Sequence, residues 1–175
     1  APAAVMAEPP VPAAGAPVPA PNRLRESVLD LARTLEKISG AKVEIVSQDL
    51  GEKDPRSRLI PIRIGAEAEN QFGVPGKKSP FKQGWRIVIG KKGIGLIGES
   101  EEATSYAIYE LLDRLGCRWY LPSDLGEVLP STKTIRLKEM DISEVPATAS
   151  REIWYKDDAF ARRNRLGGLI ISAGH

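Results

Sequence analysis

The stretch WRIVIGKKGIGLIGESEEATSYAIYELLDRLG, residues 85–116, restricts the possible folds of this chain more than any other part of it. Apolar residues alternate in its first part, as in a half-buried strand, and a second apolar run follows a Gly-Lys-Lys-Gly turn. From Ala103 to Leu115 the apolar residues have helical spacing, behind a potential N-cap at Ser100. The stretch therefore predicts a β-hairpin followed directly by a helix.

The same stretch contains the pattern G-x-G-x-x-G at residues 93–98, which is typical of a turn that binds a dinucleotide. In such a turn the helix begins inside the motif, so that its free N–H groups face the pyrophosphate. Here a second strand comes before the helix, and Glu99, Glu101 and Glu102 surround the helix start, where they would repel a phosphate. We therefore expect the glycines to serve a turn and close packing, and we expect no bound cofactor.

The segments on either side add further helices and strands. Residues 23–39 have apolar side chains at helical spacing, between a good N-cap at Asn22 and a good C-cap at Gly40. Residues 66–84 are polar and rich in glycine, which predicts a loop. Short strands are predicted at residues 42–47, 58–64, 117–122 and 133–142. Pro61 lacks a backbone N–H, so the strand that contains it should either lie at a sheet edge or direct the missing N–H of Pro61 outward.

This order of elements predicts an α+β fold, in which two main helices pack on one face of a mixed β-sheet. Residues 1–21 are nearly all Ala, Pro, Val and Gly, which predicts a semi-extended tether. The folded domain should span residues 22–142, and residues 143–175 should form a connector that ends in a new apolar strand. We expect this last strand to lack a partner, residues 166–175 to be loosely held, and a longer protein to continue beyond it.

The composition excludes several classes of function. Cys117 is the only cysteine and His175 the only histidine, so an internal disulfide, a structural zinc site and a Ser-His-Asp triad are not expected within the chain. The net charge of +2 is too small to indicate binding to nucleic acid. The sequence also lacks the run of about 20 apolar residues that a membrane span needs.

Two groups of residues near the C-terminus are candidates for chemistry. Asp157 and Asp158 are adjacent carboxylates, and glycoside hydrolysis uses a pair of carboxylates. Adjacent side chains point in different directions, however, so this pair predicts solvated charges at a helix start and no catalytic residue. Trp154 and Tyr155 should anchor the connector, although they could instead stack on a sugar ring.

Arg162, Arg163 and Arg165 form a basic cluster in the same region. Such a cluster is typical of a solvated or salt-bridging face, and it could alternatively bind an anionic glycan. Trp85, Trp119 and Cys117 are expected in the core.

The sequence resembles the small N-terminal α+β domain that precedes the catalytic barrel in several glycoside hydrolases. This domain type includes domain 2 of bacterial β-hexosaminidases and the N-terminal domain of α-glucuronidases, and it also occurs in large secreted bacterial proteins. The strand gIxIxG, the helix A-x-x-x-Y-x-x-L-L and the motif G-x-R-W carry the resemblance. In this chain the three motifs correspond to residues 94–98, 103–112 and 116–119. The segment GEVLP at residues 126–130 and the connector at residues 145–168 also fit the pattern.

The resemblance implies a non-catalytic accessory domain of a secreted or periplasmic glycoside-hydrolase-like protein that acts in polysaccharide breakdown. Its partner would be a downstream catalytic barrel of the same protein. One alternative is a carbohydrate-binding module that uses Trp154, Tyr155 and the basic cluster. Another is a structural module that associates with itself through an edge strand such as residues 58–64.

Overall fold

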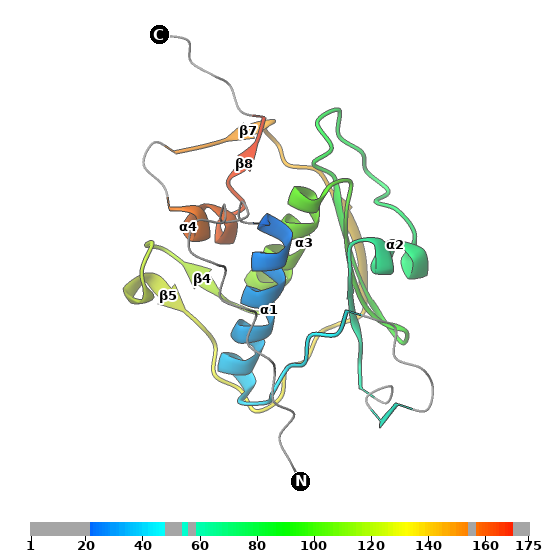
Figure 1. Ribbon diagram of the computed structural model, residues 1–175, viewed down its shortest axis with the longest axis vertical. Helices are drawn as coiled ribbons and strands as arrows, with labels where there is room; N and C mark the ends of the chain where they lie inside the picture. The colour runs from blue at the N-terminus through cyan, green and yellow to red at the C-terminus, as the bar shows by residue number, and fades with distance from the viewer. Residues whose placement is uncertain (1–21, 48–53, 56–58, 154–156, 170–175) are drawn as a thin grey trace, which may run out of the picture.

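The computed structural model of the protein describes residues 22–47, 54–55, 59–153 and 157–169. Its main sheet has four strands in the order β1-β3-β2-β6 (Figure 1). β1 is parallel to β3, whereas β2 is antiparallel to both of its neighbours. The sheet is therefore mixed, and the prediction of an α+β fold is confirmed. These strands are β1 (Ile62–Ile64), β2 (Trp85–Gly90), β3 (Gly93–Gly98) and β6 (Met140–Glu144).

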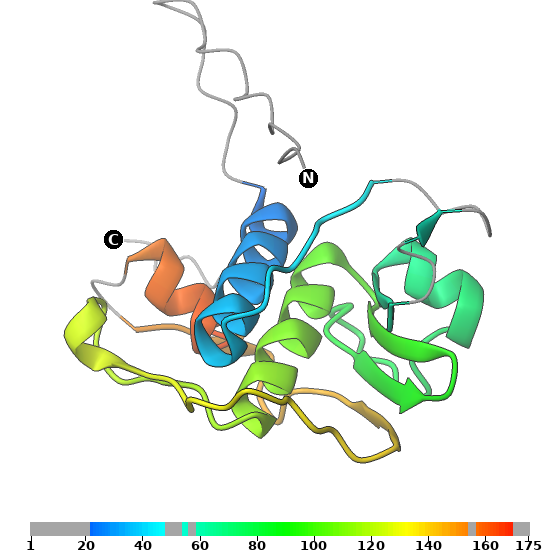
Figure 2. The same cartoon turned by 90° about the horizontal axis from the view of Figure 1, so that it is seen from below.

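The two long helices lie on the same side of this sheet (Figure 2). α3 (Glu101–Arg114) packs directly on β2 and β3, and α1 (Arg23–Ser39) packs on α3. Asn22 and Ser100 cap the two helices as predicted, since each side chain accepts a hydrogen bond from the backbone three residues later. The described part of the chain contains no helix that is long and apolar enough to cross a membrane.

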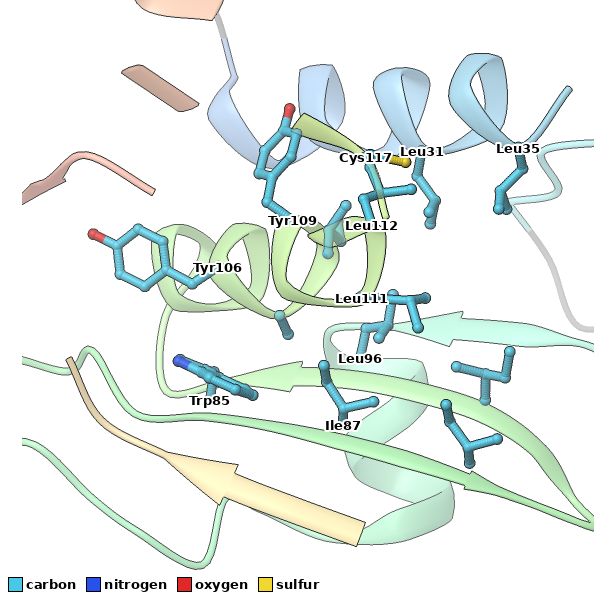
Figure 3. Close-up of a cluster of buried hydrophobic side chains, with 14 of the residues drawn as sticks. Leu31, Leu35, Trp85, Ile87, Leu96, Tyr106, Tyr109, Leu111, Leu112 and Cys117 are labelled. Atoms are coloured by element: carbon cyan, nitrogen blue, oxygen red, sulfur yellow. The ribbon is translucent and has the colours of Figure 1, made fainter. Parts of the chain in front are cut away.

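The core lies between the sheet, α3 and α1 (Figure 3). Ile87 and Leu96 face each other across the hairpin and are fully buried beneath α3. Leu31 and Leu35 of α1 cover the opposite side of α3. Trp85, Trp119 and Cys117 are buried as predicted. α3 therefore has apolar residues on more than one of its faces.

The glycines of residues 93–98 have the structural roles predicted for them. Gly93 is in the hairpin turn with φ +106°, a conformation that L side chains rarely adopt. A Cβ at Gly95 would overlap the ring of Phe72, and one at Gly98 would overlap the backbone of α3 at Ala103 and Thr104. These glycines permit two helices to approach the sheet closely, one on each face.

The prediction of a loop over residues 66–84 is wrong for its first part, because residues 66–72 form α2 (Ala66–Phe72). This helix lies on the face of the sheet opposite to α3 (Figure 1). Its fully buried Ala68 and the contact of Phe72 with Gly95 stabilise it although its sequence is polar. Tertiary packing here outweighs the local signal.

The predicted strand at residues 42–47 is absent, and these residues form no β-ladder. Ile45 and Val46 are exposed, so the alternating pattern does not correspond to a buried face. Of residues 133–142, only the last three belong to a strand, β6. The strand predicted around Pro61 does not include this residue, because β1 begins one residue after it and is only three residues long. Its position at the sheet edge is confirmed.

A smaller layer covers the far side of α1 and α3. The strand predicted at residues 117–122 is reduced to β4, which pairs with β5 around a short 3-10 helix, η2. Further along the chain, α4 packs on α1 and α3, and β7 pairs with β8. These elements are β4 (Arg118–Trp119), η2 (Asp124–Gly126), β5 (Glu127–Val128), β7 (Ser150–Arg151), α4 (Asp158–Arg163) and β8 (Gly167–Gly168).

The expectation that residues 166–175 are loosely held is wrong for Gly167 and Gly168, which pair with β7. A Cβ at either glycine would overlap a neighbouring group, so small residues are needed there. Leu169 is exposed. The predicted tether, at residues 1–21, and most of the predicted apolar strand, at residues 170–172, lie outside the described residues.

Candidate interaction surface

A buried polar network joins α4 to the two long helices. The carboxylate of Asp30 in α1 accepts hydrogen bonds from Tyr109 of α3 at 2.8 Å and from Arg162 of α4 at 3.1 Å. Arg163 donates to the same carboxylate through two nitrogens, at 3.2 and 3.3 Å. Arg162 also donates to the Tyr109 hydroxyl at 3.0 Å. Every charged group in the network thus has a partner of opposite charge.

Burial strengthens these interactions. Asp30 and Arg162 are only 5% and 8% exposed. Burial by itself would raise the pKa of Asp30, but hydrogen bonds from Arg163, Tyr109 and Arg162 outweigh it, so this pKa is lowered. Burial, together with the nearby Asp30 charge, raises the pKa of the Tyr109 hydroxyl. The network consequently holds a carboxylate, a neutral phenol and two guanidinium groups at neutral pH.

The predicted basic cluster is therefore engaged inside the domain. Besides its bonds to Asp30, the guanidinium of Arg163 lies 5.6 Å from the ring centroid of Trp119. Arg165 forms ion pairs with Glu110 at 3.3 Å and with Asp113 at 3.8 Å. The three arginines thus attach α4 to α1 and α3, and in this arrangement they offer little free charge to a ligand.

The other predicted site residues are two aromatic residues and two carboxylates near the start of α4. Trp154 and Tyr155 lie outside the described residues. Asp157 is the N-cap of α4 and accepts a hydrogen bond from the backbone of Phe160 at 2.8 Å, and Asp158 opens the helix. Both carboxylates are therefore helix-start charges, as the sequence predicts. Among the described residues, no three His, Cys, Asp or Glu side chains gather as metal ligands.

A second polar cluster surrounds the ring of Tyr106 in α3. The guanidinium groups of Arg23 and Arg151 lie 5.8 and 4.8 Å from its centroid, and Arg151 donates to the buried Gln83 at 2.7 Å. The Tyr106 hydroxyl, Nε of Arg23 and one terminal nitrogen of Arg151 have no hydrogen-bond partner among the described residues. Because all three atoms are closed to solvent, this cluster offers no entry to a ligand.

The β4–β5 hairpin presents apolar side chains to solvent. We use the term hairpin face for Tyr120, Leu121, Leu125 and Val128, which are 67%, 55%, 92% and 50% exposed. All four belong to one hairpin and lie within nine positions of the chain, which makes this hairpin a candidate for an interaction site. A pocket of about 130 Å³ lies between the hairpin and α4, lined in part by Trp119, Leu121 and Phe160. This volume is smaller than that of a typical ligand pocket, about 300–1,000 Å³.

Several contacts attach this hairpin to the core. Trp119 packs edge-on against Tyr109, with ring centroids 6.0 Å apart, and its indole N–H donates to Glu127 at 3.0 Å. Lys37 of α1 also donates to Glu127, at 2.5 Å. Asn164, just after α4, donates to the backbone carbonyl of Trp119 at 3.1 Å. The hairpin face is consequently mounted on a well-connected base.

Sequence reasoning missed Asp30 and Tyr109, the two residues that organise the polar network. Both lie within amphipathic helix patterns, where Asp30 reads as an ordinary polar position and Tyr109 as part of a helix motif. One signal was present: Asp30 lies at helical spacing from the buried residues Ser27 and Thr34, on the packed side of α1. The hairpin face was also missed, because its sequence reads as a strand and a turn.

The chain was compared with models of protein families, with curated proteins and with solved structures, and it matches none of them.

Proposed function

We propose that this chain is a non-catalytic accessory domain of a secreted or periplasmic glycoside-hydrolase-like protein that acts in polysaccharide breakdown. The sequence resemblance described above supports the proposal. In this function the domain binds a downstream catalytic barrel of the same protein and supports it. The carboxylates of Asp30, Asp157 and Glu127 are consistent with a structural role, because each holds parts of the fold together.

The hairpin face is the observation that carries the proposal. Half or more of each of its four residues is open to solvent, so this apolar area is available to a partner. Burying such side chains against a partner contributes about 25 cal/mol per Å² of apolar area. The base of the hairpin is tied to both α1 and α4, so the patch is pre-organised for binding. A neighbouring domain with an apolar surface is the partner that these features favour.

The first test is to read the natural coding sequence beyond residue 175 and to express its full-length product. Assays of reducing-sugar release from a panel of polysaccharides should show activity for the full-length protein and none for residues 1–175. The absence of a catalytic domain from the coding sequence would overturn the proposal. A full-length protein with no glycosidase activity would overturn the assignment to polysaccharide breakdown.

A double variant tests the role of the hairpin face. Leu121→Ser with Leu125→Ser should leave the melting temperature of residues 1–175 within about 2 °C, because exposed substitutions cost little. In the full-length protein the same change should make this domain melt separately from the catalytic domain in calorimetry. The matched control is Val74→Ser with Phe81→Ser, whose side chains are 49% and 50% exposed elsewhere on the surface. Equal effects of both double variants would contradict docking through the hairpin.

A further inference from the structure

An open groove of about 510 Å³ lies where α1 and α3 end. Its apolar lining comes from the last turn of α1 at Ile38, from the end of α3 at Leu115, and from Pro130 and Ile135 in the segment after β5. None of its lining residues belongs to the hairpin face. The volume is within the range of about 300–1,000 Å³ found for binding sites.

The charged residues that line this groove are all basic: Arg114, Lys133 and Arg136. Arg114 has a structural explanation, because it pairs with Glu110 at 2.9 Å and lies in the last turn of α3, where the helix dipole favours a cation. Lys133 and Arg136 are on neither helix, and neither forms an ion pair in the part of the chain that the structure describes. Two exposed cations therefore lie beside an apolar surface, and no described Asp or Glu forms an ion pair with either of them.

The segment that carries these cations is strand-like in sequence but pairs with none of the strands that the structure describes. It is fixed at one end, where Thr132 donates its amide to the carbonyl of Ile38 at 3.0 Å, and at the other by the β6 ladder that begins at Met140. Across residues 133–138, no backbone group bonds to another backbone group among the described residues. Thr134 is engaged, because the Thr132 hydroxyl accepts a hydrogen bond from its N–H at 3.3 Å and donates one to its carbonyl at 3.1 Å. Residues 135–138 are left, and among the described residues their backbone N–H and C=O groups have no partner.

We propose that this groove binds an extended acidic segment of a partner polypeptide. The segment pairs its backbone with residues 135–138 by strand addition, lays aliphatic side chains on the apolar lining and places carboxylates beside Lys133 and Arg136. The chemistry of the lining favours a peptide over other anions. The residues that line the groove include no aromatic ring on which a sugar or a nucleic-acid base would stack.

A designed peptide tests the proposal on the chain itself. The probe is an eight-residue peptide of alternating glutamate and valine with blocked ends, and its control alternates lysine and valine. NMR-detected amide hydrogen exchange should slow at alternate positions in residues 135–138 when the acidic peptide is added, and stay unchanged with the basic one. Binding of the acidic peptide without this protection would overturn strand addition.

Charge-reversal variants locate the site. Lys133→Glu with Arg136→Glu should weaken binding of the acidic peptide at least about tenfold, because carboxylates then face carboxylates. The matched control is Lys91→Glu with Lys92→Glu, two exposed lysines of the β2–β3 turn, which should leave the affinity unchanged. Trigalacturonic acid is the competing probe. Its binding in place of the peptide, or no binding of either probe, would overturn the proposal and leave the role of the hairpin face untouched.

Discussion

Arg162 in α4 donates a hydrogen bond to the Asp30 carboxylate in α1 at 3.1 Å, although 132 positions separate the two residues in the sequence. Both side chains are almost fully buried. The bond joins the first helix of the domain to its last one, and Tyr109 of α3 completes the connection. The last helix is therefore part of the folded unit and contributes to its stability.

Replacing Asp30 with Asn should destabilise the chain strongly. The change keeps the shape of the side chain but leaves two guanidinium groups without their carboxylate, and a broken buried pair costs about 3 kcal/mol. The melting temperature should fall by roughly 6–12 °C. Urea unfolding followed by circular dichroism measures the free energy.

The matched control is Asp141→Asn, which breaks an exposed pair with Arg86 at 2.7 Å. Because the side chain of Asp141 is 56% exposed, its loss should cost less than about 1 kcal/mol. Similar costs for the two variants would show that burial does not strengthen the Asp30 network.

The contribution of Asp30 should depend on pH in one direction. Burial opposes ionisation of this carboxyl, but hydrogen bonds from Arg163 and Tyr109 outweigh it and lower its pKa in the folded chain. The resulting stabilisation is complete above the pKa of the unfolded carboxyl, near 4, and is lost as the pH falls through the folded pKa. The difference in unfolding free energy between the wild type and Asp30→Asn should therefore be constant from pH 7 to about 5 and shrink below about pH 4. A difference that grows on acidification would contradict this assignment.

The sequence predicted best where local signals and tertiary packing agree. Residues 85–116 combine a strand alternation, turn glycines and a capped helix, and all three appear as β2, β3 and α3. Residues 42–47 and 133–139 carry a similar alternation, yet neither segment joins a ladder in the part of the chain that the structure describes. Whether an alternating segment joins a ladder depends on where the rest of the chain runs, which periodicity does not reveal.

The candidate surfaces were harder to predict than the fold. The arginines at positions 162, 163 and 165 were predicted to form a solvated or salt-bridging face, and they do form ion pairs. The sequence could not identify their acidic partners, because these lie up to 133 residues away. The periodicity of the sequence also fails to predict that the hairpin face is exposed. Its apolar residues resemble those of a buried strand, and only the folded chain shows that they remain exposed.

The close packing at Gly98 predicts a large effect for a small substitution. A Cβ at this position would overlap the backbone nitrogen of Thr104 and the carbonyl carbon of Ala103, and backbone atoms inside a capped helix have little room to move. Gly98→Ala should cost about 2–3 kcal/mol through overpacking. Thermal unfolding checks this value.

Gly90→Ala is the control for this substitution. A Cβ at Gly90 would meet nothing within 4 Å, and its φ is not in the left-handed region. The change should therefore leave the melting temperature almost unaltered. Equal losses at the two positions would mean that loss of the glycine itself, and not the contact with α3, is responsible.

Cys117 provides a probe of how the core opens. Its thiol is 1% exposed, and burial raises its pKa to about 11, so at pH 8 the reactive thiolate is scarce even where a reagent could reach it. Ellman's reagent should modify Cys117 of the folded chain only when the chain unfolds. In guanidinium, where the chain is unfolded, it should modify Cys117 at once. Because reaction then follows the unfolding equilibrium, Asp30→Asn should accelerate it on the order of a hundredfold, the factor that about 3 kcal/mol represents. An unchanged rate would show that Cys117 is reached by a local opening that leaves the Asp30 network intact.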